Sequence, residues 1–144
     1  MSAVAVSVRV FSHGDRDGVL ELWREVFHGD PSHRVPHLDL ERKLAVQPEL
    51  LFVAVDAGTV VGTAMAGYDG HRGWVYYLAV GPAHRRRGIG RRLVERIEEA
   101  LAGRGCPKIN LQIRAGNDRA VAFYEALGYR VEERVSMGKR LPAP

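Results

Sequence analysis

The segment Arg85–Gly90, with the sequence RRRGIG, constrains this chain more than any other stretch. It lies between an apolar run, Trp74–Val80, which is typical of a central β-strand, and an amphipathic stretch, Arg91–Leu101, which is typical of a helix. The first N–H groups of a helix have no partner inside the helix, and with the helix dipole they favour an anion. The glycines let a ligand approach the backbone, and the arginines add donors that suit phosphate. The segment therefore predicts a site for a phosphorylated ligand, most simply a pyrophosphate.

Two other interpretations of the same arginines stay open at this point. One is an ordinary basic surface loop. The other is a contact with nucleic acid, since Arg91 and Arg92 extend the cluster. No aromatic platform for bases is interleaved with the arginines, and neither a G-x-x-x-x-G-K-[ST] phosphate loop nor a G-x-G-x-x-G dinucleotide fingerprint occurs. Nucleic acid is therefore not the expected partner.

Length and composition predict one soluble domain. The 144 residues are enough for a substantial core, so we expect a single domain over 1–144. A net charge of +4 fits an anionic small ligand without demanding a polyanion. The single cysteine, Cys106, excludes an internal disulfide framework and favours a cytoplasmic location. We find neither a signal peptide nor an apolar run of roughly 20 residues, so no membrane partner is expected.

Hydrophobic periodicity predicts the elements of the N-terminal half. A helix capped by Asp15 or Asp17 carries Trp23 and Phe27 on its apolar face, where we expect them in the core. The other predicted elements are a strand over 4–10, a helix capped by Asp39 that runs through Val46, and hairpin strands over 50–55 and 59–67 joined by a three-residue loop. The polar stretch 28–38 contains three histidines without the spacing of a metal site, so we expect a substrate-facing loop and no metal.

The C-terminal half continues with alternating strands and helices. A strand over 108–115 follows a strand–helix crossover, so it should run parallel to the strand Trp74–Val80. Asn117 is the expected cap of the next helix, and Gly128 the expected left-handed residue after its end. The alternating residues over 129–139 predict a closing strand.

This order of elements, together with two motifs, resembles the GCN5-related N-acetyltransferase (GNAT) family. The first motif is Leu78-Ala79-Val80 followed by Arg85-x-x-Gly88-x-Gly90. The second is Asn117-x-x-Ala120-x-x-Phe123-Tyr124-Glu125-x-Leu127-Gly128-Tyr129. The blocks 67–73 and 136–141 are further similar to the bacterial YpeA-type acetyltransferase branch.

The resemblance implies an α/β fold with a single mixed central sheet flanked by helices in three layers, and with a splayed pair of parallel strands. It also implies acetyl-CoA as cosubstrate, with the pantetheine arm between the strands ending at Val80 and Ala115 and the pyrophosphate on the arginine loop. The implied cofactor-binding residues are Leu78, Ala79, Val80, Arg85, Arg86, Arg87, Gly88, Ile89, Gly90, Arg91, Asn117 and Arg119.

The implied reaction is direct attack of a primary amine on the thioester in a ternary complex. Tyr124 matches the general acid of the family, although its spacing alone also fits a packed aromatic. Histone-type members carry a glutamate base where this chain has Trp74. The base therefore stays open among Asp69, His71, Tyr76, Tyr77 and a water chain, or the amine arrives already deprotonated.

The acceptor is not identified by the resemblance, and a protein N-terminus, a lysine, a polyamine, an amino acid or an antibiotic all stay open. The expected partners are acetyl-CoA and this amine, and a homodimer is compatible with the sequence. A non-catalytic acyl-CoA-binding regulatory domain of the same fold is the alternative function. The residues expected to contact the acceptor are His33, Tyr68, Asp69, His71 and Tyr76.

Overall fold

The computed structural model describes residues 6–29 and 35–142. The first residues of the predicted strand over 4–10 and the acceptor candidate His33 lie outside these ranges. The chain divides into two compact units, Met1–Gln112 and Ile113–Pro144, which are described one after the other. In the described part of the chain, no helix is long and apolar enough to cross a membrane.

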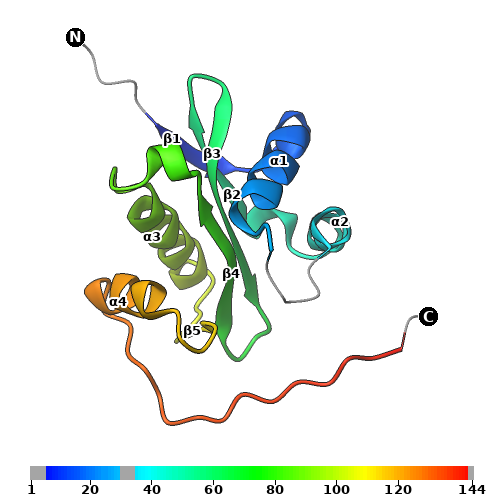
Figure 1. Cartoon of the computed structure of the whole chain (residues 1–144). Helices are drawn as coiled ribbons and strands as arrows, with labels where there is room; N and C mark the ends of the chain where they lie inside the picture. Colours follow the sequence, from blue (N-terminus) through cyan, green and yellow to red (C-terminus); the bar gives the residue numbers. More distant parts are fainter. Residues whose placement is uncertain (1–5, 30–34, 143–144) are drawn as a thin grey trace. The chain divides into compact units, whose positions relative to one another are not determined.

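The first unit is built on a five-stranded sheet in the order β1-β2-β3-β4-β5 (Figure 1). Neighbouring strands from β1 to β4 are antiparallel, whereas β5 runs parallel to β4, which confirms the predicted mixed sheet and its parallel pair. The strands are β1 Ser7–Val10, β2 Leu51–Asp56, β3 Thr59–Tyr68, β4 Gly73–Val80 and β5 Ile109–Leu111.

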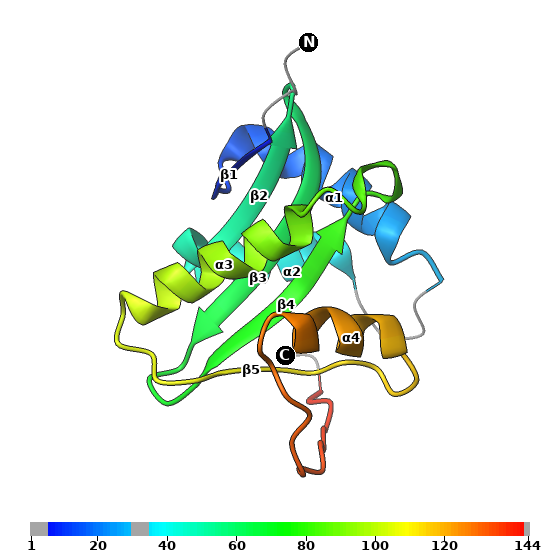
Figure 2. The same ribbon diagram turned by 90° about the vertical axis from the view of Figure 1, so that its left-hand side faces the viewer.

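Helices cover both faces of this sheet, so the first unit has three layers (Figures 1 and 2). On one face, α1 (Arg16–Val26) and α2 (Pro36–Ala45) pack Trp23 and Leu40 against the sheet. On the other face, α3 (Ile89–Ala102) packs Leu93, Ile97 and Leu101 against β2 and β3. Trp23 is fully buried, and Phe27 packs against the same cluster, as predicted.

Two boundaries in the first unit differ from the prediction. Helix α2 begins at Pro36, before the expected cap Asp39, because a proline at the first helical position supplies the right φ and lacks only an N–H that would have no helical partner. The β2–β3 loop has two residues instead of three, since Asp56 pairs with Thr59. Ala57 and Gly58 both have positive φ, 49° and 82°, as a tight two-residue hairpin turn requires.

The second unit contains one helix, α4 (Asp118–Ala126), among its described residues. Asn117 caps it as predicted, with its side-chain oxygen accepting from the Ala120 N–H at 3.2 Å. Gly128 has a φ of 95°, which confirms the predicted left-handed residue.

Near the C-terminus, one predicted strand is shorter than expected and another is absent from the described residues. Strand β5 ends at Leu111 and does not reach Ala115. Residues 129–139 form no strand, because the backbone turns locally where the Arg134 N–H donates to the Glu132 carbonyl at 2.9 Å. Alternation of apolar residues favours a strand only when a neighbour pairs with it and covers one face. Three apolar side chains of this segment are exposed, namely Val131, Val135 and Met137.

A β-bulge interrupts β4 in its middle. Thr63 pairs with Ala79 and Met65 pairs with Tyr76, so two residues of β4 lie opposite one residue of β3. The bulged residue Tyr77 has a φ of 51°, which is uncommon for a residue with an aromatic side chain. Because of the extra residue, Tyr77 points into the core on the α1–α2 side, whereas Val75 belongs to the core on the α3 side.

One buried hydroxyl holds this bulge in place. Thr63 Oγ1 accepts from Trp23 Nε1 at 2.8 Å and donates to the Tyr77 carbonyl at 3.0 Å. The ring of Trp23 lies against the ring of Tyr77 with 4.2 Å between their centroids. The Tyr77 hydroxyl in turn donates to Asp39 Oδ2 of α2. The bulge is therefore tied to both helices on this face of the sheet.

We expect Thr63→Val to destabilise the fold, because it removes the acceptor of the buried Trp23 N–H and the donor to the Tyr77 carbonyl. An unsatisfied buried polar group costs about 1–3 kcal/mol, so the free energy of unfolding should fall by that amount. Thr59→Val, on the exposed end of the same strand, is the matched control and should change it by less than about 0.5 kcal/mol. Urea unfolding measures both, and equal stabilities of the two variants would contradict the role of Thr63.

Candidate functional site

The arginine segment forms a loop directly before α3. Strand β4 ends at Val80, a short 3-10 helix covers Pro82–His84, and α3 begins at Ile89 with Gly88 as its N-cap. Gly88 has a φ of 74°, and a Cβ built on it would meet no atom within 4 Å. The backbone at the helix N-terminus is therefore left-handed and open, so that a ligand can lie against it.

The charges around this N-terminus favour an anion. Arg85, Arg86 and Arg87 are all exposed, and the first turn of α3 contains no acidic residue. Arg91 faces Glu95 one turn further along the helix, with 3.8 Å between Nε and Oε1. Ile89 is buried in the core, so of the predicted cofactor-binding residues it can offer a ligand only its backbone.

Contacts with the sheet fix the position of the loop. The Asp56 carboxylate at the end of β2 lies 3.4 Å from Arg87 Nη1 and 3.8 Å from His84 Nε2. Gly62 of β3 lets the first turn of α3 approach closely, since a Cβ there would lie 3.1 Å from the Ile89 side chain. The contacts of Asp56 were not predicted, because in the sequence it resembles an ordinary turn residue before Ala57-Gly58. Its role depends on a loop that is distant in the sequence.

Strands β4 and β5 part shortly after they begin to pair. Their ladder joins Gly73 with Ile109, Trp74 with Asn110 and Val75 with Leu111. Strand β4 then passes the bulge at Tyr77 and continues to Val80, whereas β5 has ended. The predicted cofactor residues Leu78, Ala79 and Val80 lie on this part of β4, between the point where the strands part and the arginine loop.

Four of the expected acceptor residues lie at or near the β3–β4 hairpin. Tyr68 ends β3 and is held by Gln47, whose amide donates to the Tyr68 carbonyl and accepts from its N–H, both at 2.9 Å. Asp69 Oδ1 accepts from the N–H groups of His71 and Arg72, both at 2.7 Å. These backbone donors, that of Arg72 first, lower the pKa of Asp69. The hairpin turn is therefore pre-organised by its own side chains.

The aromatic candidates on β4 differ in environment. Tyr76 is half-exposed, and burial followed by the charge of Asp69 raises its pKa. Tyr77 is buried, and its hydroxyl donates to Asp39. We therefore assign this side chain to holding the bulge in place.

The second unit carries the remaining predicted residues. Asn117 caps α4, and Arg119 is exposed in the first turn of this helix. Tyr124 is buried and its ring contacts Phe123 and Tyr129 edge to face, with centroids 5.0 and 5.5 Å apart. Burial raises the pKa of Tyr124 to about 12. The phenol therefore keeps its proton at neutral pH.

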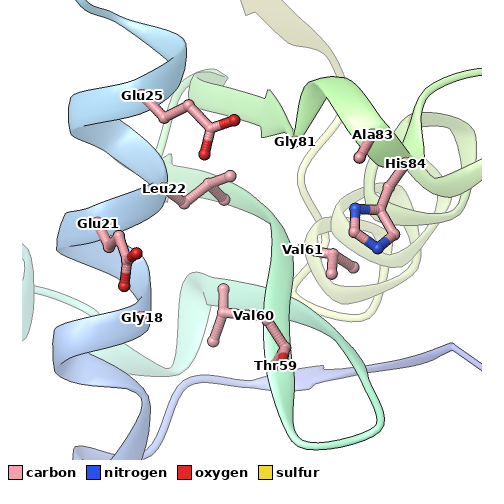
Figure 3. Close-up of a pocket in the computed structure, with 10 residues that line it drawn as sticks. All are labelled: Gly18, Glu21, Leu22, Glu25, Thr59, Val60, Val61, Gly81, Ala83 and His84. Carbon is pink, nitrogen blue, oxygen red and sulfur yellow. The ribbon is translucent and has the colours of Figure 1, made fainter.

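A pocket on the α1 side of the first unit has the wrong charge for a phosphate. It lies between α1, the start of β3 and the turn before the arginine loop (Figure 3). Two carboxylates of α1, Glu21 and Glu25, and the imidazole of His84 line it. Among the described residues, no group of three or more histidine, cysteine or acidic side chains could hold a metal ion.

The sequence was compared with protein families and with known proteins. Residues 16–129 match the model of the acetyltransferase (GNAT) family. The chain is 47% identical over 137 residues to acetyltransferase SG1711 of Sodalis glossinidius, covering 94% of this chain and 96% of the relative. It is 43% identical over 136 residues to acetyltransferase YPTB2753 of Yersinia pseudotuberculosis, with the same coverage.

Solved structures share the fold. Ard1 from Thermoplasma volcanium has a TM-score of 0.74 at 26% identity, over 90% of this chain and 85% of that one. AAC(6')-Iy, in complex with a bisubstrate analogue that joins CoA to monomethyl-acetylneamine, has a TM-score of 0.77 at 21% identity, over 96% of this chain and 99% of that one. With a family model that covers most of the chain and relatives that align along nearly all of it, the protein belongs to the acetyltransferase (GNAT) family and is an N-acetyltransferase.

Proposed function

We propose that this protein transfers an acetyl group from acetyl-CoA to a primary amine by direct attack in a ternary complex. One observation carries the proposal: β4 and β5 part after Val75, and β4 then leads into an open, basic helix N-terminus. The two units together form one N-acetyltransferase domain over 1–144 and act in the cytoplasm. The family match over 16–129 supports the single domain, because it crosses the boundary between the units.

In this proposal the cofactor follows β4 beyond the end of the β4–β5 ladder. The pantetheine arm pairs with the backbone of Leu78–Val80 as an added strand would. The pyrophosphate then lies on the first N–H groups of α3, with Gly88 leaving room for it and Arg85 and Arg86 adding charge-assisted hydrogen bonds. Arg87 is partly engaged by Asp56, so we assign it to positioning the loop as well as to the anion.

The proposal also assigns roles to three residues of the second unit. Asn117 and Arg119 flank the pantetheine arm and the phosphate end of the cofactor. The Tyr124 hydroxyl donates its proton to the departing sulfur. The phenol is protonated at neutral pH, so its proton is present when the thiolate leaves.

The chemical step forms one bond and breaks one. The amine nitrogen attacks the thioester carbonyl to give a tetrahedral oxyanion, which collapses with cleavage of the carbon–sulfur bond. The thiolate takes a proton from Tyr124, and the nitrogen loses one to solvent or to a nearby base. Asp69 is a weak base, since its backbone donors lower its pKa, so water relayed past Tyr76 is our preferred route.

The phosphate role of the loop can be tested with Gly88→Asp. The variant places a carboxylate where the pyrophosphate is expected, so CoA affinity measured by calorimetry should fall by at least about 10-fold. Gly105→Asp is the matched control, because Gly105 also has a positive φ, 81°, and open space around it, but follows the far end of α3. Unchanged CoA affinity in Gly88→Asp, with the fold intact by circular dichroism, would exclude this loop as the phosphate site.

The role of Tyr124 can be tested with Tyr124→Phe, which removes one oxygen and keeps the ring contacts. General acid catalysis is typically worth about 10²–10⁴-fold, so kcat should fall within that range while the melting temperature and CoA affinity change little. Tyr129→Phe removes a hydroxyl from the neighbouring ring and should retain kcat. Wild-type turnover of Tyr124→Phe at saturating acetyl-CoA would remove Tyr124 from the mechanism.

A further inference from the structure

Two aromatic rings form a shelf on β4 at the point where it parts from β5. The rings of Trp74 and Tyr76 are stacked, with 6.4 Å between centroids and 14° between planes. Val75 between them belongs to the core on the α3 side, so both rings point to the face of the sheet that carries α1 and α2. Tyr76 is 48% exposed, which is unusual for a large aromatic residue in the middle of a sheet.

The polar groups of the shelf are available to a ligand. Asp69 uses Oδ1 for the N–H groups of His71 and Arg72, and within residues 6–29 and 35–142 its Oδ2 has no protein donor. Over the same residues, the Tyr76 hydroxyl and the Trp74 indole N–H also have no protein partner. The charge of Asp69 acts on Tyr76, since it contributes to raising the pKa of that phenol.

A cation matches this combination of groups. The faces of tryptophan and tyrosine rings attract cations, and Asp69, two positions beyond the Gly67–Trp74 pair, adds a negative charge nearby. The shelf lies beside the Val75–Leu111 pair, the last of the β4–β5 ladder and next to the expected position of the thioester. A cation on the shelf would therefore be held a short distance from the reacting amine.

We propose that Trp74, Tyr76 and Asp69 form a second acceptor subsite, which binds a cationic group other than the amine that is acetylated. The acceptor is accordingly a small aliphatic diamine or polyamine. Its length is limited, because the Arg72 guanidinium follows Asp69 in the hairpin turn and repels a long run of positive charge. This inference rests on the proposed acetyl transfer to an amine and adds the class of acceptor.

The test compares two acceptors of equal length, 1,6-diaminohexane and 6-amino-1-hexanol, which differ in the charge of the far end. For the wild-type protein we expect the KM of the diamine to be about 10-fold lower, from one cation–π contact and one exposed charge pair. Asp69→Asn and Tyr76→Leu should each bring the ratio of the two KM values towards one. Tyr76→Phe keeps the ring and should keep most of the ratio, and Asp17→Asn, an exposed carboxylate of α1, should keep all of it.

The outcomes separate this inference from the proposed function. Calorimetry with acetyl-CoA on the same preparations tests the cofactor site alone. Acetyl-CoA binding combined with equal KM values for the two acceptors, or with a ratio that survives Asp69→Asn and Tyr76→Leu, would overturn the subsite and leave the transferase. A lower KM for a lysine-containing tetrapeptide than for the diamine would overturn the small-molecule assignment. Failure to bind acetyl-CoA would contradict the proposed function itself, and the subsite with it.

Discussion

The left-handed conformation of Tyr77 in the middle of β4 is the constraint on which the site depends. A bulge bends a strand and increases its twist, so β4 turns away from β5 soon after the Val75–Leu111 pair. Such a conformation costs of order 1–3 kcal/mol and persists only where its surroundings enforce it. Here the Thr63 hydroxyl and the ring of Trp23 enforce it, both fully buried.

The same bulge organises both faces of the sheet. On the α1–α2 side it directs Tyr77 to Asp39, while Trp74 and Tyr76 stay accessible. Beyond the bulge, β4 leads to the N-terminus of α3, whose first turn packs closely on β3 because Gly62 has no side chain. The parting of β4 from β5 and the open N-terminus of α3 thus follow one another along the chain, and the proposed binding of an acyl carrier with a phosphorylated tail uses both.

The features that could be predicted from the sequence have local causes. The Asn117 cap and the left-handed Gly128 after α4 each follow from what a helix end requires of its neighbours. Features that depend on distant partners could not be predicted. Thr63 lies 40 positions from Trp23, and its neighbours in the sequence suggest only a buried strand. The alternating residues over 129–139 resemble a strand, yet a turn at Arg134 interrupts them.

Hydrogen–deuterium exchange with and without acetyl-CoA tests the central claim most directly, namely that the cofactor lies along β4 beyond the bulge and on the loop before α3. The account predicts that acetyl-CoA slows exchange in two segments of the first unit, Leu78–Val80 and Arg86–Arg91. The β1–β2 pair at the far edge of the sheet should not change. Protection confined to other segments, or none in either of these two at saturating acetyl-CoA, would contradict it.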